Sequence, residues 1–97
     1  MQVLFLLLDG PRNLAITPVQ ISYKLGDKLT CSADANPTPM YEWKDNITAF
    51  PTLTKGPQYT IPYVVSPFAV ECRASNPFGS DSRSAPINLS SGKLAYI

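Results

Sequence analysis

The chain has 97 residues, the size of one small domain, and its 8 Lys+Arg nearly balance its 7 Asp+Glu. Because the basic residues form no run, we expect neither nucleic acid nor direct membrane contact by this domain. Histidine is absent, so the commonest general base and zinc ligand is missing. We therefore expect neither enzyme activity nor a cofactor.

The chain begins with a run of six apolar residues, Val3 to Leu8. This run is too short to cross a bilayer, and it lacks the basic region and the cleavage site of a signal peptide. We interpret residues 1–10 as the end of a preceding domain or a linker, with a truncated signal peptide or a cloning scar as alternatives. Residues 11–90 then form one domain, and residues 91–97 a C-terminal linker.

Short strands are expected throughout residues 11–90. Ten prolines and five glycines interrupt the sequence, and no stretch keeps a helical period, so the chain is predicted to be all-β. The first strand, Leu14 to Ile21, is expected to change sheets at Pro18, because proline cannot donate a backbone hydrogen bond. The later strands are expected at residues 28–33, 40–44, within 49–57 (short and irregular), 58–61, 68–75 and 80–89.

The strands alternate between apolar and polar residues, which predicts one buried and one solvated face for each. The turns that separate them are expected at residues 24–27, 45–46 and 76–79, each of which contains Gly, Asn or Asp. The core is predicted to contain Leu29, Tyr41, Trp43, Ile61 and Val70.

The two cysteines are Cys31 and Cys72. Without histidine they cannot complete a structural zinc site, and they are too far apart for a CxxC redox pair. A disulfide is the remaining interpretation. Closing a loop of about 40 residues stabilises a fold by about 4 kcal/mol on the chain-entropy model. Because such bonds persist in oxidising compartments, we expect an extracellular or cell-surface location.

About seven short strands, with an early cysteine, a late cysteine and one tryptophan between them, predict a two-sheet β-sandwich. In such a sandwich Cys31 and Cys72 lie on opposite sheets, and Trp43 packs against the bond that joins them.

Three segments carry a resemblance to a known family: GDKLTC (26–31), NPTPMYEWK (36–44) and VECRASNPFG (70–79). Together they resemble immunoglobulin superfamily domains of the C2 or I type. Within that family, the segments most resemble the domains of tandem cell-surface receptors such as sialic-acid-binding receptors and carcinoembryonic-antigen-type adhesion molecules. One position departs from the pattern. Val70 stands where the family has a corner tyrosine, so the hydrogen bond of that tyrosine is not expected, and Pro67 or Phe68 takes its role.

The resemblance implies a recognition or spacer module in a multidomain adhesion or immune-type receptor. Its partners would be neighbouring immunoglobulin domains and other proteins, including a second copy in homophilic binding. Two alternatives remain open from the sequence. One is a structural module of an intracellular filament array, in which the cysteines stay reduced, and the other is a soluble secreted defence protein.

Residues that point outward from the central strands, and one at a hairpin tip, are the candidates for partner binding. The alternative for the charged ones is an ordinary solvated sheet face, and the alternative for the hairpin-tip residue is that it folds back over its own turn. An arginine after the second cysteine binds sialic acid in variable-type relatives, but we do not expect a sialylated glycan here. The candidates are Met40, Glu42, Lys44, Glu71, Arg73 and Phe78.

Two segments match the N-glycosylation pattern, beginning at Asn46 and at Asn88. Asn46 is the better candidate because it follows a predicted strand in an exposed turn. The alternative in both cases is a plain polar turn residue.

Overall fold

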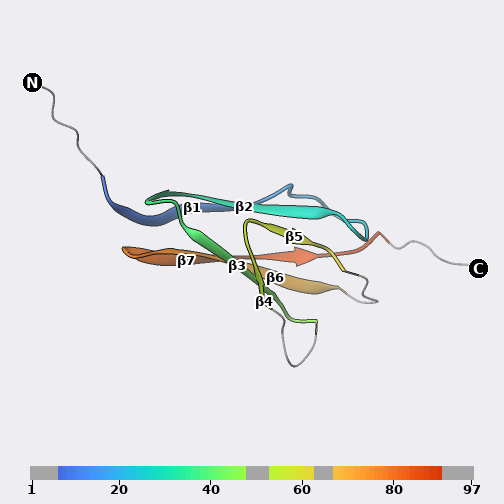
Figure 1. Cartoon of the computed structure of the whole chain (residues 1–97). Helices are drawn as coiled ribbons and strands as arrows, with labels where there is room; N and C mark the ends of the chain where they lie inside the picture. Colours follow the sequence, from blue (N-terminus) through green and yellow to red (C-terminus); the bar gives the residue numbers. More distant parts are fainter. Residues whose placement is uncertain (1–6, 48–52, 63–66, 91–97) are drawn as a thin grey trace, which may run out of the picture.

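The structure is a computed structural model that describes residues 7–47, 53–62 and 67–90 (Figure 1). Two antiparallel sheets pack face to face, as the alternation of buried and exposed positions requires. Among these residues no helix has the length and apolar character to cross a bilayer. The strands are β1 (Asp9–Thr17), β2 (Lys28–Asn36), β3 (Met40–Asp45), β4 (Leu53–Lys55), β5 (Gln58–Thr60), β6 (Phe68–Asn76) and β7 (Gly79–Ile87).

One sheet has three strands in the order β1-β2-β5, and the other has four in the order β4-β3-β6-β7. All five strand pairs are antiparallel. The predictions of an all-β chain, seven strands, two sheets and a sandwich are therefore confirmed.

The core lies between the two sheets and consists of alternate residues of the facing strands. Leu29, Trp43, Ile61 and Val70 are all at most 1% exposed, as predicted. Tyr41 is partly buried and packs against this cluster. Its hydroxyl oxygen accepts a hydrogen bond from the Ala33 backbone N–H at 3.1 Å, which joins β3 to β2 across the sandwich.

A disulfide joins the two sheets. Cys31 on β2 is bonded to Cys72 on β6, with an S–S distance of 2.08 Å and a Cα–Cα distance of 6.5 Å. Trp43 is the residue paired with Cys72 on the neighbouring strand β3, and all three are buried in the same cluster. The prediction of one inter-sheet disulfide is confirmed.

The first strand differs from the prediction at both ends. β1 begins at Asp9, which pairs with Asn36 of β2, so Asp9 and Gly10 lie within a strand of this sandwich. A Cβ on Gly10 would lie 3.1 Å from the Phe78 carbonyl oxygen, so a larger residue would require the β6–β7 hairpin to move by a few tenths of an ångström. At the other end β1 stops at Thr17, and Ile21 lies outside it.

The expected change of sheet at Pro18 is not seen, because β1 ends at Thr17 and belongs to the β1-β2-β5 sheet alone. Tyr23 forms a parallel bridge with Leu89, beyond the end of β7. Its backbone N–H donates to the Asn88 carbonyl at 2.8 Å, and its carbonyl accepts from the Ser90 N–H at 2.8 Å. After β1 ends, the chain therefore stops pairing with β2, and its next backbone pairing is with the residues that follow β7.

The Tyr23 hydroxyl also forms hydrogen bonds to the backbone, although Tyr23 is not at the position of the family's corner tyrosine, which Val70 occupies. The Tyr23 side chain is 3% exposed. Its hydroxyl donates to the Pro18 carbonyl at 2.8 Å and accepts from the Gln20 backbone N–H at 3.1 Å. This side chain closes the loop between β1 and β2, while Val70 and Phe68 are ordinary core residues.

A candidate protein-binding face

The outer face of the four-stranded sheet brings together most of the residues predicted to bind a partner. Residues directly opposite each other on antiparallel strands share a face. Glu42 on β3 is opposite Arg73 on β6, and Lys44 is opposite Glu71. The register therefore places these four charges beside one another, with acids and bases alternating along and across the strands.

The charges of this face are only partly paired within the molecule. Lys44 Nζ lies 3.4 Å from Glu71 Oε1, and the two side chains are 55% and 33% exposed. The Arg73 guanidinium donates to the Ser80 hydroxyl at 3.2 Å. Among the described residues, Arg73 and Glu42 take part in no ion pair. Exposed ion pairs contribute about 0–1 kcal/mol to folding, so this pattern is not needed for stability.

Exposed apolar side chains flank these charges. Met40 on β3 is 69% exposed, and Leu53, opposite Lys44 on β4, is 58% exposed. Lys55 is opposite Glu42 and adds a further base. Leu53 and Lys55 were not among the predicted residues, because the sequence around them is too irregular to show which side chains share a face. Their pairing with β3 is visible only in the structure.

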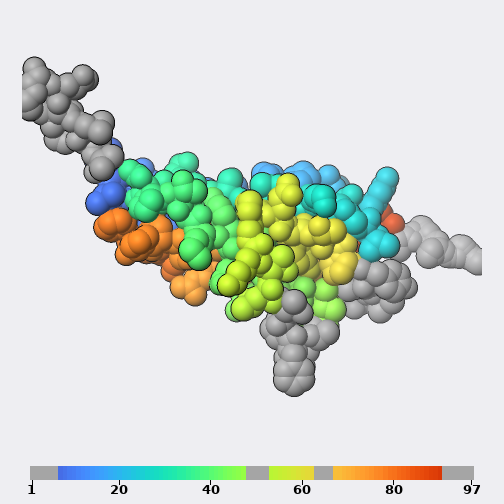
Figure 2. Space-filling model, in the orientation of Figure 1, coloured from blue at the N-terminus to red at the C-terminus, as the bar shows by residue number. Residues whose placement is uncertain are grey.

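The fourth strand of the sheet presents small hydroxyl side chains on this face. Ser80, Ser82 and Ser84 on β7 are exposed and lie opposite Ser75, Arg73 and Glu71 of β6. Figure 2 shows the edge of the sandwich at which β3, β4 and β5 reach the surface. The face therefore has long charged side chains in its centre and short ones along one edge.

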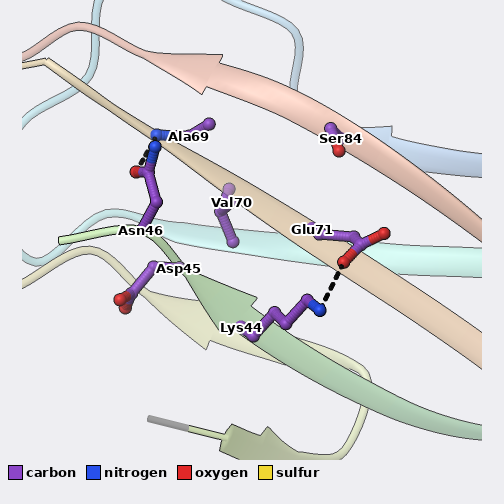
Figure 3. A pocket seen from close by; sticks show the side chains of 7 residues that line it. All are labelled: Lys44, Asp45, Asn46, Ala69, Val70, Glu71 and Ser84. Carbon is purple, nitrogen blue, oxygen red and sulfur yellow. Dashed lines mark hydrogen bonds and ion pairs between the residues drawn. The ribbon is translucent and has the colours of Figure 1, made fainter. Parts of the chain in front are cut away.

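Two depressions lie on this face. One, of about 300 Å³, lies between the ends of β3 and β6 (Figure 3), where Lys44 and Glu71 meet on one side and Asn46 turns toward Ala69 on the other. The other, of about 230 Å³, lies among Glu42, Lys44 and Arg73 and continues to Leu53. Both are open rather than enclosed and are lined largely by charged or polar residues, which suits contact with another protein surface better than a buried small molecule.

Phe78 is not part of this face. It lies at the tip of the β6–β7 hairpin and is 52% exposed. Asn76 fixes this turn: its Oδ1 accepts from the Phe78 N–H, and its Nδ2 donates to the carbonyls of Asp9 and Pro37, all at 2.9 Å. The structure thus places Phe78 in the turn at one end of the sandwich, whereas the other five candidates lie on the paired strands β3 and β6.

Both candidate glycosylation asparagines are exposed. Asn46 follows β3, and its side-chain oxygen accepts from the Ala69 N–H at 2.8 Å (Figure 3). Asn88 follows β7, and its backbone carbonyl binds Tyr23. Thr48, the last residue of the first pattern, lies outside the described residues. Glycosylation at both positions stays a prediction.

The potential metal ligands are scattered in the part of the chain that the structure describes. No group of three or more His, Cys, Asp or Glu is placed to hold a metal there. Burial, and secondarily the hydrogen bond to Asp45, raise the pKa of the Tyr59 hydroxyl. This hydroxyl donates to Asp45 Oδ2 at 2.9 Å and joins β5 to β3. Its environment is that of a core residue that links the sheets.

Comparisons with known proteins agree with the fold. No family model matches the sequence, and no curated protein matches it. Among solved structures, the solution structure of the PKD domain from human VPS10 domain-containing receptor SorCS2 is similar to this chain, with a TM-score of 0.55 and 16% sequence identity. The match covers 98% of this chain and 86% of that one. The fold is immunoglobulin-like.

Proposed function

We propose that this domain is a non-catalytic recognition or spacer module of a multidomain extracellular protein of the adhesion or immune-receptor type. It acts through protein contacts made by the outer face of the four-stranded sheet. The observation that carries the proposal is the set of alternating charges on that face, flanked by exposed Met40 and Leu53. Exposed charges add little to folding, so their alternating arrangement in the centre of this face favours a role in recognition.

Three further observations support the extracellular setting. The Cys31–Cys72 bond is of a kind that persists in oxidising compartments. The three sequence segments resemble C2 or I-type domains of cell-surface proteins. The similar PKD domain comes from a protein that is named as a receptor. Neighbouring immunoglobulin-like domains in a longer chain are the natural partners at the two ends of the sandwich.

The filament alternative requires free thiols, and the disulfide argues against it. Mass spectrometry of the protein from its native source separates the two cases. A Cys31–Cys72 crosslink with a glycan on Asn46 supports the receptor module. Free thiols and unmodified asparagines would instead support the filament module.

Alanine substitutions test the face directly. A fluorescent multimer of the domain, applied to cells of the tissue that expresses it, should bind the cell surface. Variants with Glu42→Ala, Lys44→Ala or Arg73→Ala should keep the circular dichroism spectrum of the wild type and lose at least about tenfold in binding, as charged contacts at interfaces commonly do. The matched control is Ser32→Ala on the outer face of the other sheet, which should bind normally.

The proposal assigns different roles to Phe78 and to the sheet face. Phe78→Ala tests the end of the sandwich, and Met40→Ala and Glu71→Ala complete the face. If all five face variants bind as well as the wild type, this face is not the binding surface, and if Phe78→Ala does so too, neither is the hairpin tip.

A further inference from the structure

The four central charges of the candidate face form a compact square. Along β3 the outward residues are Glu42 and Lys44, and along β6 they are Arg73 and Glu71. Neighbouring strands are about 4.8 Å apart and alternate residues about 7 Å apart. Each acid therefore has a base beside it on the next strand and a second base along its own strand. Figure 3 shows one such side, the pair formed by Lys44 and Glu71.

This square is complementary to itself. If a second copy faces the first, related by a two-fold axis that runs along the strands between β3 and β6, Glu42 lies over Arg73 of the second copy. Lys44 then lies over Glu71 of the second copy. If the axis instead runs across the strands, Glu42 lies over Lys44 of the second copy and Arg73 over its Glu71. In both arrangements all four contacts join opposite charges.

The remaining side chains favour the axis that runs along the strands. That axis places β4 of one copy over β7 of the other, because these strands are at opposite edges of the sheet. Exposed Leu53 then meets Ser84 of the second copy, and Lys55 meets its Ser82. Long side chains at one edge are matched by short ones at the other, so the two sheets can approach closely at both edges.

The charges are also available for such contacts. Within the described residues, neither Arg73 nor Glu42 is ion-paired, although each is the other's neighbour on the adjacent strand. Lys44 is paired with Glu71, but its side chain stays 55% exposed. A facing copy therefore meets solvated charges that can re-pair across the interface.

We propose that the outer face of the β4-β3-β6-β7 sheet is a homophilic site whose partner is a second copy of this chain. The inference rests on the proposed function, which assigns this face to protein contacts, and it names the partner. Because the face is only four strands wide, the contact belongs to the small class of interfaces and is weak in solution. Many copies on two opposed surfaces would strengthen it by multivalency.

Two charge variants test the proposal. Glu42→Lys with Glu71→Lys makes the square wholly basic, and Lys44→Glu with Arg73→Glu makes it wholly acidic. Sedimentation equilibrium at rising protein concentration should show a wild-type dimer that weakens in high salt. Each double variant alone should dimerise at least about tenfold more weakly, because all facing charges then repel. An equimolar mixture of the two should form a heterodimer at least as tight as the wild-type dimer.

The heterodimer also shows that both variants fold, because an unfolded variant would not restore binding. The matched control is Lys24→Glu with Lys28→Glu, which changes the net charge as much as the acidic variant does, on a turn and on the other sheet. It should dimerise as the wild type does. A wild type that stays monomeric at every concentration, a basic variant that self-associates like the wild type, or a mixture that does not heterodimerise would each overturn the proposal.

The outcome separates this inference from the proposed function. If the wild type is monomeric but the alanine variants still lose binding to cells, the face binds a different protein, and only the homophilic inference fails. If the wild type dimerises through this square but no cell binding depends on it, the proposed receptor role fails and the homophilic contact stands.

Discussion

The two outer faces of this sandwich are built differently. In both sheets the outward residues alternate along the strands with residues of the same buried core. The three-stranded sheet nevertheless presents mainly neutral polar side chains in the centre of its outer face, including Thr30 and Ser32. The four-stranded sheet presents two acids and two bases in the corresponding place. The outward residues of the three-stranded sheet are Arg12, Ala15, Thr17, Lys28, Thr30, Ser32, Asp34, Gln58 and Thr60.

The difference shows what solubility alone requires. A solvated sheet face needs polar side chains of high strand propensity, and threonine and serine meet that need without strong electrostatic specificity. Alternating charges add a pattern that another surface can match. We therefore interpret the three-stranded face as a solvated exterior and the four-stranded face as the one that recognises a partner.

The largest effect on stability is expected from removing the disulfide that joins the two sheets. Cys31→Ala with Cys72→Ala should lower the free energy of unfolding by about 4 kcal/mol on the chain-entropy model, because the bond closes a loop of 41 residues' separation. Denaturant unfolding followed by Trp43 fluorescence measures this change. A loss below about 1 kcal/mol would mean that the core alone orients the sheets.

A smaller effect is expected at the hydrogen bond that joins β5 to β3. Tyr59→Phe removes the bond to Asp45 and should lower the free energy of unfolding by about 1 kcal/mol at neutral pH. Burial first, and Asp45 second, raise the pKa of the Tyr59 hydroxyl above its ordinary value of about 10. The folded state therefore keeps a proton that the unfolded state loses as the pH rises.

The sign of the pH dependence follows from this difference in bound protons. The contribution of Tyr59 to stability is complete below about pH 10 and decreases as the pH rises further. Denaturant unfolding measured from about pH 8 upward should show that the free energy of unfolding falls more steeply for the wild type than for Tyr59→Phe. The two curves of free energy against pH should begin to converge at about pH 10. Parallel curves for the two proteins would contradict the assignment.

The smallest effects on stability sharpen the contrast between the faces. Glu42→Ala and Arg73→Ala should change the free energy of unfolding by no more than about 0.5 kcal/mol, yet they should weaken self-association. Thr30→Ala should do the reverse, costing up to about 1 kcal/mol through lower strand propensity while self-association is unchanged. Thermal unfolding and sedimentation of the same samples measure both. If Thr30→Ala weakens association as much as Arg73→Ala, the two faces do not differ in function.

Most of the fold was predictable because its signals are local. Period-two alternation placed Leu29, Trp43 and Val70 in the core, and two cysteines allow only one pairing within a chain. The same alternation put Glu42 and Arg73 on an outer face. What it did not provide was the neighbour of each strand, so Leu53 and Lys55 were missed.

The role of Tyr23 and the start of β1 were also not predictable. An aromatic residue in a polar loop gives no sign of which carbonyl its hydroxyl will reach, and Asp9 and Gly10 have little strand propensity. Gly10 lies in β1 beside the β6–β7 hairpin, which is distant from it in the sequence. Such contacts between distant segments exist only after the chain has folded.

By itself, the sequence determined that this protein is a disulfide-linked β-sandwich, because side-chain alternation and cysteine content act on each strand separately. Only the tertiary structure decided that Glu42 meets Arg73 and Lys44 meets Glu71, because register between strands depends on the whole sheet. That register turns four scattered charges into one self-complementary square.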